Sequence, residues 1–102
     1  MSKAFVYTEM QFSVPFNKAP WRELNPLIRA QPGFVNKTWL SGFQNNSVGG
    51  IYEFDSIENA SRFAHDYFPG EARKMNAAFT TRVFDESVTE EASGQLNSVH
   101  YR

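Results

Sequence analysis

The order of strand-like and helix-like segments is the feature that most narrows the fold of this chain. Residues 34–43 and 50–54 are rich in aromatic and β-branched residues, which are typical of strands, and the polar turn 44–48 separates them. A helix-like segment precedes the first run, another follows the second, and residues 4–12 and 78–85 are strand-like. This β-α-β-β-α-β order predicts a ferredoxin-like α+β domain with a four-stranded antiparallel sheet.

Prolines set the expected limits of the two helices. In the first helix Pro26 interrupts the apolar face, and we expect a kink or a restart at Asn25 because proline has no backbone N–H. In the second helix, apolar residues recur at helical spacing until Pro69-Gly70, which is expected to end the helix. A loop then leads to the last strand.

The composition is that of one globular domain with a high aromatic content. The chain has 102 residues, 41% hydrophobic and 21% charged, so residues 1–102 are expected to form a single domain with its core in residues 4–85. An aromatic share of 16% indicates a thick aromatic core, an apolar ligand cavity or a buried interface. The polar residues 86–102 are either a loose tail or an arm that lies on a partner subunit.

Charge and residue usage exclude several classes of function. The net charge is −1 without a basic stripe, so we expect no nucleic-acid partner. There is no cysteine, the two histidines lack ligand-like spacing, and no glycine loop is suited to phosphate, so we expect no metal and no bound cofactor. His65 is expected to face solvent. No apolar segment has membrane length and no signal segment is present, so we expect a cytoplasmic protein without membrane contact.

Aromatic residues on both faces of the expected strands indicate a sheet that is covered on both sides. Both helices of this fold pack on one face, yet Phe5 and Tyr7 alternate with the core positions of the first strand, and Phe79 and Phe84 lie on opposite faces of the last. Rings left in water would lose a stabilisation of about 25 cal/mol per Å² of apolar area that burial provides. Stacking of two sheets covers these rings, so the pattern predicts a homodimer.

Three short segments and one helical proline resemble a known family. The three segments are Pro32-Gly33-Phe34 with Lys37 and Trp39, Gly49-Gly50-Ile51-Tyr52 with Phe54, and Val83-Phe84-Asp85. The helical proline stands in Leu24-Asn25-Pro26-Leu27. Together they resemble the YdhR-type monooxygenases of the dimeric α+β barrel superfamily, which are relatives of the antibiotic-biosynthesis monooxygenases. The resemblance covers the chain through Asp85. It implies a dimer and an oxygenase-like activity that needs no metal, haem or flavin.

Glu9 is the candidate catalytic residue. Strand alternation places it beside Tyr7 and Gln11 on the face away from the helices, where a partner sheet would limit water. Loss of solvation favours the protonated form of a carboxyl group and suits it to general base catalysis. The alternative, which we favour for this residue taken alone, is a structural ion pair with Arg82 or Lys37 from adjacent strands.

Aromatic rings supply the candidate walls of a substrate pocket. Trp39, Tyr52 and Tyr7 are suited to hold a planar aromatic molecule, and Gln11 and Arg82 are the candidate polar groups of the same site. For any one ring taken alone, packing in the core is the simpler interpretation.

The favoured function is that of a cofactor-independent monooxygenase acting on an aromatic or polyketide-like small molecule. Such an enzyme needs an apolar cavity that deprotonates an electron-rich substrate and shields the resulting carbanion from water. Two alternatives stay open. One is a non-oxidative cyclase or isomerase on the same scaffold, and the other is a small-ligand-binding protein without catalysis.

Overall fold

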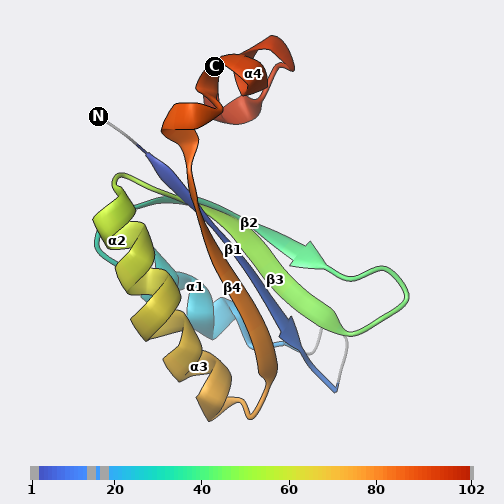
Figure 1. Ribbon diagram of the computed structural model, residues 1–102. Helices are drawn as coiled ribbons and strands as arrows, with labels where there is room; N and C mark the ends of the chain where they lie inside the picture. The colour runs from blue at the N-terminus through green and yellow to red at the C-terminus, as the bar shows by residue number, and fades with distance from the viewer. Residues whose placement is uncertain (1–2, 14–15, 17–18, 102) are drawn as a thin grey trace.

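The computed structural model describes residues 3–13, 16 and 19–101, which form one four-stranded antiparallel sheet and its helices (Figure 1). The strands are β1 (Ala4–Gln11), β2 (Phe34–Ser41), β3 (Ser47–Phe54) and β4 (Ala78–Asp85). Their order in the sheet is β2-β3-β1-β4, and every neighbouring pair is antiparallel. The predicted ferredoxin-like α+β fold is therefore confirmed.

The helices cover one face of this sheet. They are α1 (Trp21–Arg29) and a continuous rod made of α2 (Ile57–Arg62), the π-helical turn η2 (Phe63–Tyr67) and α3 (Phe68–Lys74). Figure 1 shows α1 and the rod on the same side of the strands. None of the helices in the described part of the chain is long and apolar enough to cross a membrane.

The expected end of the second helix at Pro69-Gly70 is wrong, because a π turn precedes the proline. The amide of Phe68 donates to the carbonyl of Phe63, five residues back, and this wide turn restarts the hydrogen-bond ladder. Pro69 then falls in the first turn of α3, where a missing N–H costs nothing. The helix continues to Lys74 in place of the expected loop.

The expected restart of the first helix at Asn25 is also wrong, since α1 runs through Pro26. Backbone hydrogen bonds persist on both sides of the proline. Leu24 N donates to Pro20 O at 3.1 Å, and Ala30 N donates to Pro26 O at 3.1 Å. One lost hydrogen bond on an exposed helix surface is therefore not enough to divide α1.

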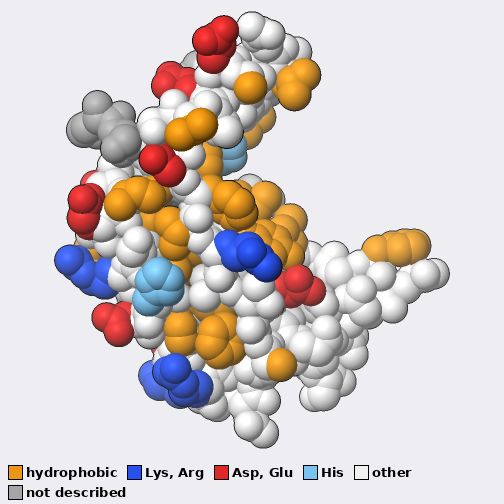
Figure 2. Space-filling view, viewed as in Figure 1, with side chains coloured by type: hydrophobic (Ala, Val, Ile, Leu, Met, Phe, Trp, Pro, Cys, Tyr) orange, Lys and Arg blue, Asp and Glu red, His pale blue; other side chains and the backbone are white. Residues whose placement is uncertain are grey.

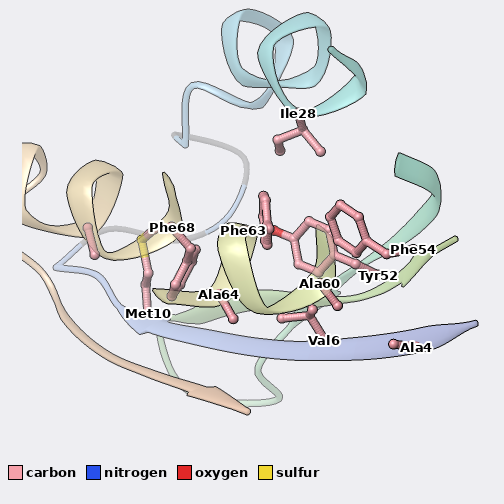
Figure 3. Close-up of a cluster of buried hydrophobic side chains, with 11 residues drawn as sticks. Ala4, Val6, Met10, Ile28, Tyr52, Phe54, Ala60, Phe63, Ala64 and Phe68 are labelled. Carbon is pink, nitrogen blue, oxygen red and sulfur yellow. The ribbon is translucent and has the colours of Figure 1, made fainter. Parts of the chain in front are cut away.

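The core lies between the helices and the sheet. Figure 3 shows the rings of Tyr52, Phe54 and Phe63 packed together, with Ile28 of α1 facing them. Val6, like its neighbours at alternate positions of β1, is buried on this face, as predicted from strand alternation.

The other face of the sheet is partly apolar, and the C-terminal segment borders it at one end, where the ring of His100 packs against Phe5. Ile51 and Phe84 remain 39% and 50% exposed there. Together with Phe5 they line a groove of about 420 Å³ beneath the C-terminal arm (residues 86–101), and apolar side chains gather in this hollow in Figure 2. This open face meets the expectation of a sheet with rings on both sides.

The C-terminal arm consists of η3 (Glu86–Val88), α4 (Glu90–Gln95) and η4 (Val99–Tyr101), and stands beyond one end of the sheet (Figure 1). Its last turn returns to the start of β1. Lys3 Nζ donates to the His100 carbonyl at 2.7 Å, and His100 Nδ1 lies 2.9 Å from Glu53 Oε1. These contacts anchor the arm to its own subunit, and an additional contact with a partner stays a prediction.

Candidate functional site

An aromatic-walled cavity lies between the helices and the sheet. Its volume is about 30 Å³, which is room for about one water molecule. The sheet strands β1, β2 and β3 form its floor, and α1, η2 and α3 form its roof. The lining residues that bear on its chemistry are Thr8, Lys37, Trp39, Tyr52, Phe63, Tyr67 and Glu71.

Stacked and tilted rings form the wall of the cavity. The centroid of the Phe63 ring lies 4.6 Å from that of Tyr52 and 5.5 Å from that of Tyr67. Trp39 packs against Phe16 with a centroid distance of 5.6 Å, and its Nε1 donates to Asn25 Oδ1 of α1 at 3.0 Å. Flat apolar walls of this kind suit a planar ligand.

Lys37 brings an amine into this wall. It pairs with Tyr52 in the β2–β3 register and shares a sheet face with Trp39. Its Nζ lies 3.0 Å from the centroid of the Trp39 ring and 4.5 Å from that of Tyr52. Gly50 leaves room for the lysine, because a Cβ there would lie 2.6 Å from Lys37 Cε. The ion pairs formed among residues 3–13, 16 and 19–101 do not include Lys37.

The enclosure changes which groups carry a proton. Burial lowers the pKa of the Lys37 amine to about 6, so much of it is neutral at neutral pH. Burial also raises the pKa of Tyr52, and burial together with the nearby Glu71 carboxylate raises the pKa of Tyr67 to about 12. The two phenols therefore stay protonated as hydrogen-bond donors, whereas the amine is able to accept a proton.

Two hydroxyl groups of the lining have no hydrogen-bond partner in the part of the chain that the structure describes. They are Thr8 Oγ1 and Tyr67 Oη, both buried atoms. Tyr67 Oη is close to the Glu71 carboxylate, and Thr8 Oγ1 is close to the Tyr52 hydroxyl, but neither pair meets hydrogen-bond geometry. An unsatisfied buried polar group costs about 1–3 kcal/mol, so both hydroxyls are available to an oxygen atom in the cavity.

The sheet divides the predicted site residues into two groups. Trp39 and Tyr52 line the cavity on the helix side. Tyr7 and Glu9 lie on the open face, since their neighbours in β1 are the buried core positions. Gln11 continues the open face of β1, and Arg82 is exposed opposite Tyr7 in β4. The six residues do not form one pocket.

The surroundings of Glu9 differ from those expected. Tyr7 Oη donates to Glu9 Oε1 at 2.9 Å, and this bond is the main cause of the raised pKa of Tyr7. The alternative ion pair with Arg82 or Lys37 is not among those in the described residues, and Lys37 lies on the other face. The role of Glu9 as a proton acceptor stays a prediction, and it requires a ligand on the open face.

Sequence reasoning missed Lys37 and Tyr67 as site residues. Alternation in β2 places Lys37 on the same face as Trp39, which was a usable signal. Tyr67 is one of the apolar residues that recur at helical spacing in the second helix, and that pattern gives it no role beyond packing. His65 is exposed, as expected. The described residues hold no group of three histidine or acidic side chains arranged to bind a metal ion.

Comparison with known proteins gives the family. The profile of the family described as "Putative mono-oxygenase ydhR" matches residues 5–96. The chain belongs to this family. The resemblance carried by the proline, glycine and aromatic segments is thereby confirmed. No curated protein sequence matches the chain.

Two solved structures share the fold. One is a point mutant of SnoaB, a cofactor-independent oxygenase from Streptomyces nogalater, with a TM-score of 0.58 and 20% identity over 81% of this chain and 90% of the other. The second is a monooxygenase from the gene ActVA-Orf6 of Streptomyces coelicolor in complex with nanaomycin D. It has a TM-score of 0.58 and 15% identity over 82% of this chain and 87% of the other. Family and fold together support a monooxygenase-like function.

Proposed function

We propose that this protein is a cofactor-independent monooxygenase whose substrate, an aromatic or polyketide-like small molecule, binds in the cavity between the helices and the sheet. The observation that carries the proposal is the wall itself, in which aromatic rings enclose one amine and two hydroxyls without partners. Membership in the monooxygenase family and a fold shared with a cofactor-independent oxygenase support it. The substrate anion supplies the electrons that reduce oxygen.

A substrate with fused rings requires the cavity to widen. Ligand pockets usually measure about 300–1,000 Å³, far more than the closed volume of about 30 Å³. α1 buries fewer residues than the other roof elements, since Ile28 is its one buried residue. Its polar connection to the floor is the hydrogen bond between Trp39 Nε1 and Asn25 Oδ1. We expect substrate entry to displace α1 and to break this bond.

We also propose that two subunits pair through their open sheet faces. Ile51 and Phe84 are the exposed apolar side chains that such a pair would cover, and Phe5 and Tyr7 lie between them on β1. A second sheet over this face would place Glu9 in an enclosed environment as well, which is the condition for its predicted role.

Oxygen uptake tests the proposed function. The purified protein is supplied with a panel of anthrone-like and quinol substrates under labelled oxygen gas, with heat-denatured protein as the control. We expect oxygen consumption and one labelled oxygen atom in the product, the second leaving as water. Substrate binding with proton exchange but without oxygen uptake would support a cyclase or isomerase instead. Binding without any turnover would support a ligand-binding protein.

A further inference from the structure

We propose that Lys37 is the proton acceptor of the cavity and that the cavity takes aromatic molecules with an acidic hydroxyl group, namely phenols and the enol forms of aromatic ketones. This inference rests on the proposed function, since it names the base and the substrate class of the same site. It differs from the assignment predicted from sequence, which placed the base on the open face at Glu9.

The position of the amine carries the argument. Nζ lies against the rings of Trp39 and Tyr52, and Gly50 leaves the space through which the side chain reaches them. Structural lysines inside proteins are paired, yet no ion pair or hydrogen bond of Lys37 occurs within the described residues. A largely buried amine without a counter-ion at a cavity wall is suited to act as a base.

The other titratable groups around the amine do not compete for this role. Tyr52 and Tyr67 have raised pKa values and stay neutral. Glu71, which lines the same cavity, forms an ion pair with Lys74 at 3.6 Å. Arg29 of α1 is exposed and lines an adjoining surface recess together with Lys37, and a guanidinium cannot accept a proton.

The proton-transfer step is balanced within the site. The O–H bond of the substrate hydroxyl breaks, a new N–H bond forms on Nζ, and no electron changes hands. The product is an ammonium–phenolate pair. The ammonium remains against the two aromatic rings, where a cation is favoured by about 0.5–2 kcal/mol. Thr8 Oγ1 and Tyr67 Oη are free to donate to the oxygen anion.

Spectral titration of a bound phenol tests the inference. The probe is 7-hydroxycoumarin, whose anion and neutral form absorb differently, at pH 7, where the free probe is mostly neutral. We expect the wild-type protein to raise the ratio of anion to neutral probe by about tenfold or more on binding. Lys37→Met should bind the probe in its neutral form. Arg73→Met, which removes an exposed cation outside the cavity, should behave as the wild type.

The number of protons released when the probe binds shows whether Lys37 accepts the proton of the probe or is a permanent cation. Lys37→Arg keeps a positive charge that cannot accept a proton, so ionisation of the bound probe must release about one proton per site to the buffer. In the wild type the amine keeps that proton, and we expect release close to zero. Calorimetry in two buffers with different ionisation enthalpies measures both values.

Each contrary result overturns the inference. These are no binding at millimolar probe, an anion ratio unchanged in Lys37→Met, or release of one proton by the wild type. The proposed function is tested separately from the assignment of Lys37. Oxygen uptake that persists in Lys37→Met would refute the Lys37 assignment alone. Ionisation of the probe without oxygen uptake from any substrate would refute the monooxygenase and leave the assignment in place.

Discussion

Replacement of Lys37 by methionine should stabilise the protein, and the gain should depend on pH. Above pH 10.5 the amine is neutral in both the folded and the unfolded chain, so its burial carries no ionisation cost. As the pH falls from 10.5 to about 6, the unfolded chain holds a proton that the folded protein lacks. The free energy of unfolding therefore decreases by about 1.4 kcal/mol per pH unit.

The magnitude at pH 7 follows from this slope. Three and a half pH units below 10.5, the burial of the amine costs about 5 kcal/mol. The contacts of the ammonium with Trp39 and Tyr52 favour the charged form by about 0.5–2 kcal/mol and reduce the cost to about 3–4.5 kcal/mol. Lys37→Met removes the ionisable group and keeps an unbranched apolar side chain. It should gain about 3–5 kcal/mol at pH 7.

Urea titrations from pH 6 to pH 10 measure the effect. The wild type, Lys37→Met and the exposed control Arg73→Met are compared at each pH, so that other titrating groups cancel in the difference. We expect the advantage of Lys37→Met to shrink steadily towards pH 10 and the control to follow the wild type. An advantage that is constant with pH, or a variant that is less stable throughout, would show that Lys37 is an ordinary solvated ammonium.

Three further predictions concern the neighbouring features. The wild type should have twice the monomer mass of 11.7 kDa by light scattering, and Phe84→Asp should give a folded monomer, whereas an unchanged dimer would exclude the open face as the interface. Glu9→Gln should stay dimeric with nearly unchanged turnover, and a loss of about 10²-fold in turnover would show that Glu9 on the open face is the base. Trp39→Phe should lose about 1 kcal/mol in thermal or urea melts through the Asn25 hydrogen bond, and an unchanged melt would contradict this.

The fold was accessible from sequence because its signals are local. Turn residues and alternation marked β4 with its observed bounds of Ala78–Asp85, and no long-range information was needed. The helix end at Pro69 was not accessible. A π turn leaves the apolar spacing almost unchanged, so the periodicity could not show that the proline falls at the start of α3.

The site residues could be predicted only in part, because the register between strands decides which residues share a face. Tyr52 shares a face with Val6, which follows from the β1–β3 pairing and not from the sequence of β3 alone. The prediction placed Tyr7 and Tyr52 in one pocket, although they lie on opposite faces of the sheet. The room for the Lys37 side chain depends on Gly50 of β3, which lies opposite Trp39, a relation that only the paired strands reveal.

The π turn makes the cavity sensitive to the number of residues in its roof. A π turn amounts to one residue inserted into a regular helix, here within Phe63–Tyr67. Excision of the exposed Asp66 would restore the regular repeat but rotate all that follows by about 100° and retract it by about 1.5 Å. Glu71 would then turn away from the cavity that it lines. In homologous chains, length variation at this turn would thus alter the chemistry of the pocket without any change in its side chains.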